Sequence, residues 1–270
     1  MMLMPELPEV ETVIRELQKE ILFKTIISYS VFWNKTFVSD SEHKLNGLTI
    51  NNITRKGKYI IFSLSQSFLI IHLRMTGNLL ISDSMGNKKK HDRVIFVFDD
   101  NSQLVFNDIR KFGRIYHTDR PENILSRVGI DALDSRLTPN LFYGLLHKSK
   151  RNIKAFLLSQ EYISGLGNIY VDECLFRAGI TPFTISANIR REKAHALLEV
   201  IKEILEFAII NMGTTISDYR DAFGNFGSNQ NFLKVYQRGG LPCFKCGAPI
   251  KRIWYAGRGT HYCNVCQKTF

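Results

Sequence analysis

Four cysteines within the last 28 residues constrain this chain more than any other feature of its sequence. They form two pairs, Cys243-Phe-Lys-Cys246 and Cys263-Asn-Val-Cys266, with 16 residues between the pairs. A two-residue spacer lets both thiolates of a pair face one point, and two such pairs joined by a hairpin predict a tetrahedral structural zinc site without an open position. A redox pair or unrelated thiols are the alternatives. Because such a short C-terminal segment cannot bury a large apolar core, we expect the metal to supply much of its folding energy.

The composition fits a cytosolic protein that binds a polyanion. Lys and Arg outnumber Asp and Glu by 36 to 25, which gives a formal net charge of +11 and a pI near 9.4. Nucleic acids attract such a charge, although ribosome-associated proteins and proteins of anionic membrane surfaces share it. The sequence has no apolar run of about eighteen residues and no basic-then-apolar N-terminal segment, so we expect neither a membrane span nor a secretory signal.

The first part of the chain has the pattern of an amphipathic helix followed by short strands. From Pro8, the segment PEVETVIRELQKEIL places its apolar residues on one helical face, with Glu9 and Glu11 as first-turn partners of the helix dipole. From about Thr25 to His117, runs such as YIIFSL, FLIIHL and VIFVF are separated by polar turns. Runs that are apolar on both faces indicate a sandwich or barrel-like sheet. We therefore predict a β-sandwich domain over residues 1–118.

The second part is helical and ends in the cysteine-rich segment. Residues 119–134 lack β texture and are interpreted as a linker. The 3.6-residue spacing of apolar side chains then predicts a helical domain over 135–235, followed by a zinc hairpin over 236–270. The glycine-rich stretch from Thr214 to Asn229 loses this spacing and is expected to be a mobile loop. The expected fold class is α+β with two domains.

The stretch SGLGNIYVDE joins a glycine-containing turn to a helix that begins near Asn168. Gly165 and Gly167 allow the backbone to approach a ligand closely, and the free N–H groups at a helix N-terminus bind phosphate well. An ordinary capped helical hairpin explains the same residues. On the expected zinc hairpin, Arg252 and Arg258 are either working residues or simply solvated arginines.

Six motifs, in order along the chain, resemble bacterial formamidopyrimidine-DNA glycosylases. They are PELPEVET, RKGKY, HLRMTG, NDIRKFG, SGLGNIYVDE and the terminal cysteine site that ends in GRGTHYCNVCQK. The resemblance runs from Pro5 to the C-terminus. It implies a β-sandwich domain, a helical domain with a helix-two-turn-helix element, one structural zinc ion, and a cleft between the domains for damaged double-stranded DNA. It also implies excision of oxidised purines such as 8-oxoguanine and formamidopyrimidines, followed by cleavage of the abasic strand.

The resemblance implies four catalytic residues. Pro5 matches the N-terminal proline whose nitrogen forms an imine with the sugar, and Glu6 matches the general acid and base beside it. A terminal amine has a far larger neutral fraction at pH 7 than a lysine. Lys58 matches a lysine that contacts phosphate and aids β-elimination, and Arg258 matches the arginine assigned to δ-elimination. Without the resemblance, Pro5 would be interpreted as a helix-entry proline and Lys58 as a solvated lysine.

The resemblance also implies a set of DNA-binding residues. Met75, Arg110 and Phe112 match the trio that fills the hole left by the extruded base, with core packing as the alternative for Met75 and Phe112. The segment 214–229 would be the flexible cover over that base. The remaining residues match phosphate contacts and are His72, His91, Arg151, Lys154, Asn168 and Tyr236.

The front of the chain departs from the resemblance. Residues 1–3 precede Met4, and a Pro5 nitrogen locked in a peptide bond cannot form an imine. Our hypothesis is that synthesis begins at Met4, or that the leader is otherwise removed, so that the active chain starts at Pro5. The alternatives are an endonuclease VIII-like enzyme for oxidised pyrimidines, which typically has glycine where Leu7 stands, and a catalytically blocked zinc-ribbon protein that only recognises damaged DNA. We expect a monomer.

Overall fold

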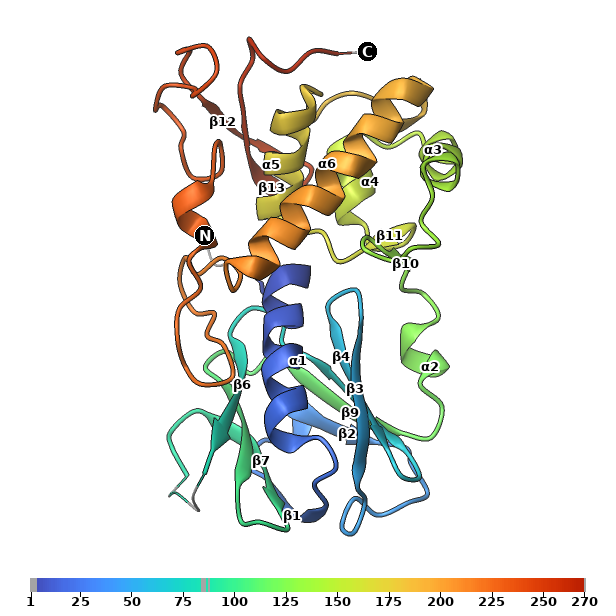
Figure 1. Ribbon diagram of the computed structural model, residues 1–270, viewed down its shortest axis with the longest axis vertical. Coiled ribbons are helices and arrows are strands. Elements are labelled where there is room, and N and C mark those ends of the chain that lie inside the picture. The colour runs from blue at the N-terminus through green and yellow to red at the C-terminus, as the bar shows by residue number, and fades with distance from the viewer. Residues whose placement is uncertain (1–3, 84–85, 87, 270) are drawn as a thin grey trace. The chain divides into compact units, whose positions relative to one another are not determined.

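The computed structural model describes residues 4–83, 86 and 88–269, and it consists of two compact units (Figure 1). The first unit takes in the chain up to Arg127 together with Asn211–Gln230, and the second comprises Val128–Ile210 and Asn231–Phe270. The α+β class with two domains is confirmed. The grouping differs from the expected domain limits: residues 211–230 belong with the first unit, the expected linker is divided after Arg127, and the zinc hairpin is part of the second unit.

Helix α1 (Leu7–Ile21) is the amphipathic helix expected at the front of the chain. Pro8 stands in its first turn, where a missing N–H breaks no intrahelical hydrogen bond. The apolar side chains recur every three or four residues, so one face of the helix is buried. That face consists of Val10, Val13, Ile14, Leu17 and Ile21.

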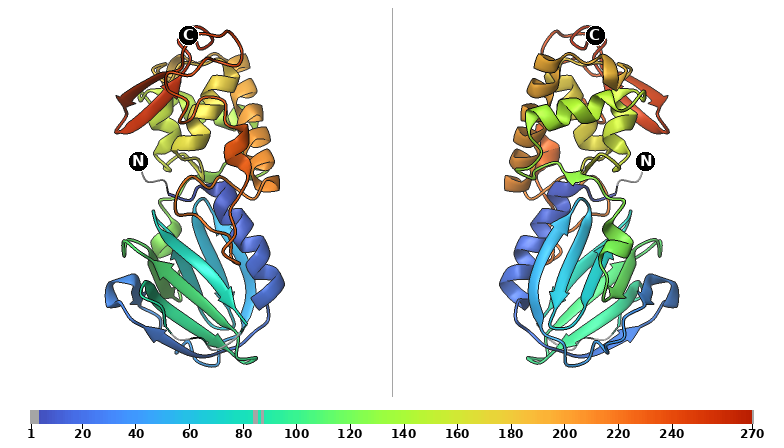
Figure 2. Two further views of the ribbon diagram at one scale, coloured as in Figure 1. Left: turned by 90° about the vertical axis from the view of Figure 1, so that its left-hand side faces the viewer. Right: turned by 90° about the vertical axis from the view of Figure 1, so that its right-hand side faces the viewer.

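The strands of the first unit form two sheets. The four-stranded sheet has the order β1 (Ile26–Val31), β7 (Asp92–Phe98), β8 (Gln103–Asp108), β6 (Gly77–Ser82). The five-stranded sheet has the order β2 (Phe37–Ser39), β9 (Arg114–Thr118), β5 (Phe68–His72), β4 (Tyr59–Leu64), β3 (Ile50–Lys56). Neighbouring strands are antiparallel except for the parallel pair β2 and β9. The predicted sandwich is confirmed, and α1 runs along one side of it (Figure 2).

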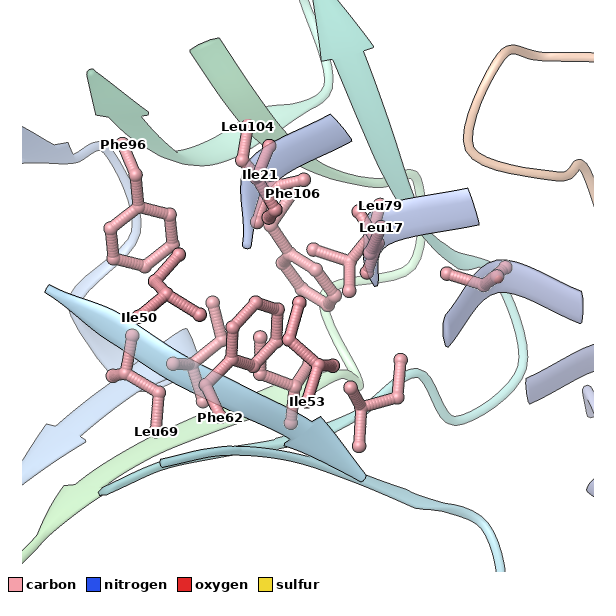
Figure 3. Close-up of a cluster of buried hydrophobic side chains, with 14 of the residues drawn as sticks. Leu17, Ile21, Ile50, Ile53, Phe62, Leu69, Leu79, Phe96, Leu104 and Phe106 are labelled. Atoms are coloured by element: carbon pink, nitrogen blue, oxygen red, sulfur yellow. The ribbon is translucent and has the colours of Figure 1, made fainter. Parts of the chain in front are cut away.

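One apolar cluster fills the space between the two sheets and α1 (Figure 3). Leu17 and Ile21 enter it from α1, Phe62 from β4, and Phe96 and Phe106 from the four-stranded sheet. Each large side chain buried in this way contributes roughly 1.5–3 kcal/mol relative to an exposed one. The cluster therefore provides a rigid frame for the turns at the strand ends.

The segment 211–230 is anchored in the same cluster. Tyr219 is 6% exposed and Ala222 is fully buried, and both belong to the core of the first unit. The backbone N–H of Ile81 on β6 donates a 2.9 Å hydrogen bond to the Ala222 carbonyl. In Figure 1 this segment is the orange loop beside α1 and β6. The loss of helical periodicity was a correct sign of irregular backbone, but the segment is docked by long-range contacts.

The second unit is helical, as expected. It contains α3 (Pro139–His147), α4 (Ile153–Leu158), α5 (Asn168–Ala178) and α6 (Arg191–Ile210). The stretch expected to be a linker has structure of its own, because α2 (Glu122–Leu125) lies in it and β10 (Ile130–Asp131) pairs in parallel with β11 (Ile163–Ser164). None of the helices described for residues 4–83, 86 and 88–269 is both long and apolar enough to cross a membrane.

The C-terminal hairpin pairs β12 (Lys251–Tyr255) with β13 (Arg258–Tyr262). The turn between them needs left-handed backbone, with φ of 51° at Ala256 and 70° at Gly257. A small buried cluster lies beneath the hairpin and contains Phe176, Val235 and Ile250 together with two of the cysteines. So few apolar side chains cannot stabilise a fold of this size alone.

Candidate active site and metal centre

The N-terminal dipeptide of the expected site is fixed by the start of α1. Pro5 and Glu6 are buried, and Glu6 occupies the N-cap position of the helix. The backbone N–H of Glu6 donates a 2.8 Å hydrogen bond to the Glu9 carboxylate, three residues further on. A side chain in this position holds the chain entry to the helix, as in a capping box. Glu9 therefore holds the backbone of Glu6, the residue that follows Pro5, in addition to any interaction with the helix dipole.

Glu9 also binds the segment 211–230. Its second carboxylate oxygen accepts the backbone N–H of Thr214 at 2.7 Å, across 205 residues of sequence. Gly213 has φ of 75°, and a Cβ atom there would lie 2.9 Å from the Glu9 side chain, so only glycine fits. One buried carboxylate thus links the N-terminal dipeptide to the docked segment.

Lys58 and His72 lie close together at the edge of the five-stranded sheet. Lys58 lies in the β3–β4 turn and precedes Tyr59, whose partner on β5 is His72. Lys58 is only 5% exposed and is not a solvated lysine. Burial, with Arg74 and Lys58 nearby, lowers the pKa of His72 to about 3. Its Nδ1 accepts the backbone N–H of Arg74, so the neutral ring carries its proton on Nε2 and can offer a phosphate one uncharged donor.

Met75, Arg110 and Phe112 come together although they lie on separate turns. The Arg110 guanidinium donates to Met75 Sδ at 3.6 Å and lies 4.7 Å from the centroid of the Phe112 ring. Phe112 is 46% exposed, and all three residues stand between strands rather than on them. Core packing on strands therefore does not account for Met75 or Phe112.

A buried carboxylate sets the position of this trio. Asp108 accepts the backbone N–H of Arg110 at 3.1 Å and that of Gly113 at 2.8 Å, on either side of the exposed tip. Thr76, next to Met75, donates its hydroxyl to the same carboxylate. Buried donors left without such an acceptor would cost about 1–3 kcal/mol each. Asp108 is thus the common anchor of both turns.

His91 lies at the same strand ends. Its carbonyl accepts the backbone N–H of Asp108 at 2.9 Å, and its Nδ1 lies 3.3 Å from Nη2 of Arg93. The first unit therefore brings His91 close to the carboxylate that anchors the trio.

In the second unit, Asn168 and the buried Tyr236 meet at the N-terminus of α5. Asn168 Nδ2 donates to the Gly259 carbonyl at 2.9 Å and to the Tyr236 hydroxyl at 3.4 Å. The Glu173 carboxylate accepts the backbone N–H groups of Val235 and Tyr236, which holds the tyrosine in place. Desolvation raises the pKa of Glu173 in spite of these hydrogen bonds. Two of the expected phosphate ligands thus lie where helix N–H groups favour anions.

Lys154, expected to contact phosphate, forms a buried ion pair in this structure. It is 0% exposed, and its Nζ lies 2.5 Å from Asp172 Oδ1 and 3.5 Å from the Gly259 carbonyl. Asp172 also accepts the backbone N–H of His261 on β13 at 2.8 Å. A lysine that is buried and paired in this way does not reach a phosphate in solution. Its contacts instead join α4, α5 and the hairpin, so in this structure the Lys154 ammonium positions these elements and is not presented to solvent.

Arg151 and Arg258 are accessible, as expected of phosphate ligands. Arg151 forms an exposed ion pair with Glu161, with 2.9 Å between Nη1 and Oε2. Arg258 is exposed at the start of β13, opposite Tyr255. An exposed ion pair is worth at most about 1 kcal/mol, so a phosphate can displace Glu161 from Arg151 at little cost.

The four cysteine sulfurs fit one tetrahedral zinc ion. All four lie within 4.8 Å of one another, with 3.9 Å between Cys243 and Cys266 and 3.5 Å between Cys246 and Cys263. Tetrahedral Zn–S bonds of about 2.3 Å place sulfurs about 3.8 Å apart. With four thiolates as ligands the metal has no open position, so it orders the hairpin and takes no part in catalysis.

Three carboxylates that organise the site were not identified as such from the sequence. Glu9 had a local signal, because a carboxylate three residues after an N-cap fits a capping pattern. Asp108 and Asp172 lie within NDIRKFG and SGLGNIYVDE, but their partners come from other elements. No local pattern identifies such partners.

Sequence models of three domains match the chain. The formamidopyrimidine-DNA glycosylase N-terminal domain matches residues 4–115, and the helix-two-turn-helix (H2TH) domain of formamidopyrimidine-DNA glycosylase matches residues 128–220. A zinc finger found in formamidopyrimidine-DNA glycosylase and isoleucyl-tRNA synthetase matches residues 240–269. The last match agrees with the geometry of the four sulfurs.

Full-length relatives and solved structures give the same result. The formamidopyrimidine-DNA glycosylases of Carboxydothermus hydrogenoformans and Protochlamydia amoebophila are 42% and 40% identical, each over 98% of this chain and 100% of the relative. The Lactococcus lactis enzyme has been solved as a mutant in complex with DNA containing a formamidopyrimidine lesion, and that structure is 38% identical with a TM-score of 0.89 over 98% of this chain and 100% of the other. Its complex with abasic-site DNA covers the same shares, at 38% identity and a TM-score of 0.88. The chain therefore belongs to the formamidopyrimidine-DNA glycosylase family.

Proposed function

We propose that this chain is a bifunctional DNA glycosylase and abasic-site lyase that excises oxidised purines from duplex DNA in base excision repair. The family assigns the glycosylase reaction, and the Pro5-Glu6 dipeptide carries the proposed chemistry. Both residues are buried at the entry to α1, and the Glu9 carboxylate holds the backbone of Glu6. A nucleophile and its acid held on a rigid element need little reorganisation before they react.

The reaction begins with the Pro5 nitrogen. Its lone pair forms a bond to C1′ of the sugar while the bond from C1′ to the base breaks, and the base leaves with a proton. The Glu6 carboxyl protonates the ring oxygen, which opens the sugar and gives an iminium ion. The Glu6 carboxylate then takes a C2′ proton, which expels the 3′ phosphate by β-elimination, and a second elimination expels the 5′ phosphate.

Cationic side chains stabilise the leaving phosphates. Lys58 is close to the neutral His72, and burial strengthens the field of an ammonium group. Arg258 stands exposed on the hairpin, where a planar guanidinium can bind phosphate oxygens with two hydrogen bonds. Asn168, Tyr236, Arg151 and His91 are proposed to add phosphate contacts that position the duplex without reading its sequence.

Met75, Arg110 and Phe112 are proposed to occupy the hole left in the base stack. Extrusion of a base costs a few kcal/mol, which inserted side chains offset. The exposed Phe112 ring can enter the stack, and Arg110 can donate to the orphaned base. Asp108 presents the two turns together, so the trio is arranged before DNA binds.

The proposed nucleophile requires a chain that starts at Pro5. Residues 1–3 lie outside the described residues. Any residue joined to Pro5 would remove the lone pair of its nitrogen by amide resonance. The intact mass of the protein from its native host tests this requirement, and a form that retains residues 1–4 would be inactive as a glycosylase.

Borohydride trapping tests the proposal. A chain that starts at Pro5 should become covalently attached to an 8-oxoguanine duplex when the imine is reduced, whereas the chain that retains Met4 should not. Failure of the trimmed chain to attach would leave a damage-binding protein without catalysis.

A second substrate class has one specific observation in its favour. The Lactococcus lactis relative, 39% identical with a TM-score of 0.89 over 98% of this chain and 100% of the other, has been solved with DNA that contains an oxidised pyrimidine. The same trapping assay with a thymine glycol duplex compares the two classes. We expect the purine lesion to be trapped faster, and the opposite order would assign an endonuclease VIII-like specificity.

We propose damaged duplex DNA as the partner of a monomeric chain in the cytoplasm. One chain supplies both the imine-forming residues and the zinc hairpin, so no second copy is needed for the chemistry. Zinc, bound by the four cysteines, is the cofactor and is structural.

A further inference from the structure

The C-terminal hairpin packs on the rest of the second unit through one of its two strands. Gly259, Thr260 and His261 of β13 are buried, whereas every residue of β12 is exposed or half-buried. β13 lies beside α5 (Figure 1). The position of the exposed Arg258, at the start of β13, therefore depends on the contacts that hold this strand on α5.

Two side chains of α5 hydrogen-bond to β13 as a neighbouring strand would. Asn168 Nδ2 donates to the Gly259 carbonyl at 2.9 Å, and Asp172 Oδ2 accepts the backbone N–H of His261 at 2.8 Å. The two spacings match, because four residues of helix rise about 6 Å and two residues of strand about 7 Å. Backbone groups of alternate residues point to the same edge of a strand, so α5 covers the edge of β13 that turns away from β12.

Asp172 accepts hydrogen bonds from two elements at this junction. Its Oδ1 lies 2.5 Å from Lys154 Nζ on α4, and its Oδ2 also lies 3.3 Å from Nδ1 of His261. The side chains of Lys154 and Asp172 are 0% and 1% exposed. Loss of the carboxylate would therefore take this acceptor from both the ammonium group and the strand N–H in a place that water does not reach.

The zinc site by itself does not fix Arg258. The zinc ligand that follows β13 is Cys263, and the strand from Arg258 to Cys263 spans roughly 16 Å. The Arg258 guanidinium donates a 3.1 Å hydrogen bond to the carbonyl of Gly257, a contact that moves with the turn itself. The contact between Asp172 and His261 lies between the zinc ligand and the arginine along the strand, so it controls how the tip is held.

We propose that Asp172 is a positioning residue for the second elimination, because its hold on the His261 N–H fixes β13 and so places the Arg258 guanidinium at the departing 5′ phosphate. In that step a proton passes from C4′ to water, the bond from C5′ to oxygen breaks, and the phosphate leaves with the electron pair. The contact with His261 stands on geometry, and only its effect on the second elimination rests on the proposed function. The first elimination uses the Pro5-Glu6 dipeptide of the other unit and should not depend on Asp172.

Two double variants separate the contact with His261 from loss of the ion pair. Lys154→Met with Asp172→Asn removes both charges but keeps an oxygen that can accept the His261 N–H. Lys154→Met with Asp172→Leu removes the same charges and leaves a side chain of similar size without an acceptor. Uncharged replacements of a whole buried ion pair are often tolerated, and zinc content and the thermal transition check that each variant is folded.

The product ratio of the two eliminations measures the effect on Arg258. On a preformed abasic-site duplex in single turnover, the leucine variant should lower the ratio of second to first elimination products by at least about tenfold, as should Arg258→Gln. Its rate of borohydride trapping should not change. The asparagine variant should keep the wild-type ratio. So should Arg177→Met with Glu203→Leu, which removes an exposed ion pair of the same unit.

Amide hydrogen exchange at His261 measures the contact without catalysis. Its protection should fall at least about tenfold in the leucine variant and stay at the wild-type value in the asparagine variant. If the leucine variant loses its zinc, the asparagine variant carries the test alone.

Three results would contradict the proposal or its basis. An unchanged product ratio in a zinc-loaded leucine variant, or a tenfold fall in the asparagine variant, would overturn the inference. A ratio that Arg258→Gln leaves unchanged would overturn its catalytic part. Failure of the wild type to be trapped would instead refute the proposed function, and exchange at His261 would still decide whether Asp172 holds the strand.

Discussion

The β-sandwich and the zinc hairpin hold their functional side chains by different means. In the sandwich, two sheets and α1 enclose a large apolar cluster, and buried Asp108 and Glu9 fasten the turns to it. In the hairpin, only a few apolar side chains lie beneath the strands, and four thiolates converge on one point. Arg258 therefore depends on a metal, whereas Arg110 depends on packing.

Because of this difference, the sandwich and the hairpin should unfold independently. The chain contains two tryptophans, Trp33 after β1 in the first unit and Trp254 on β12 of the hairpin. Variants that keep only one of them, Trp33→Phe or Trp254→Phe, report each frame separately by fluorescence. The following changes test whether the frames are separable.

Removal of zinc should have the largest effect. Structural zinc contributes on the order of 10 kcal/mol to folding of its own site, and the small cluster beneath the hairpin cannot replace it. Chelation, or Cys263→Ser, should unfold the Trp254 region and weaken binding to an abasic duplex by more than about 100-fold. The thermal transition reported by Trp33 should not move. Joint loss of both signals would show that the sandwich also depends on the metal.

Lys154→Met should have the next largest effect. The substitution removes the cation from a fully buried pair and leaves Asp172 uncompensated, which costs about 3–5 kcal/mol. Urea unfolding followed by Trp254 measures it. Arg151→Ala, which breaks an exposed ion pair of the same unit, is the matched control and should cost no more than about 1 kcal/mol. Equal costs would mean that burial of the Lys154 pair does not matter.

Asp108→Asn should lower the free energy of unfolding of the sandwich alone, by about 2 kcal/mol. An amide presents one oxygen where the carboxylate presents two, so either Thr76 or one of the backbone N–H groups loses its acceptor. The Met75, Arg110 and Phe112 turns should loosen, and excision opposite cytosine should fall more than cleavage of an abasic site. Unchanged excision would mean that Asp108 does not position Met75, Arg110 and Phe112. Zinc content serves as the control for the hairpin.

The smallest expected effect is the pH dependence of stability that comes from His72. Its pKa is near 6.5 in the unfolded chain and about 3 in the folded one, so its contribution is complete above pH 6.5 and is lost as pH falls toward 3. The free energy of unfolding reported by Trp33 should fall by about 1 kcal/mol between pH 6.5 and 5.5 because of this residue. His72→Gln should be flatter over that range, and an identical slope would place the histidine in contact with solvent.

Local patterns were sufficient to predict much of the fold. Apolar periodicity identified α1, the strands and the helices of the second unit, because each element buries one face and so carries a regular pattern. The zinc site was predicted because its ligand spacing is itself local. The trio of Met75, Arg110 and Phe112 was named from resemblance, and the structure brings the three together.

Contacts between distant segments were not predictable in this way. Lys154 was expected to contact phosphate, and nothing near it in sequence indicates that Asp172 on another helix pairs with it. The segment 214–229 was expected to be mobile, yet its anchors, Glu9 and Glu16, lie more than 200 residues earlier. Burial of a polar group depends on its partner, and a single sequence does not identify partners.

Mapping the borohydride-reduced adduct by mass spectrometry tests the central claim most directly. A chain that starts at Pro5 is trapped on an 8-oxoguanine duplex, digested, and its peptides are sequenced. We predict that the sugar remnant is attached to the nitrogen of Pro5. Attachment to Lys58, or to any other amine while Pro5 stays unmodified, would contradict the account.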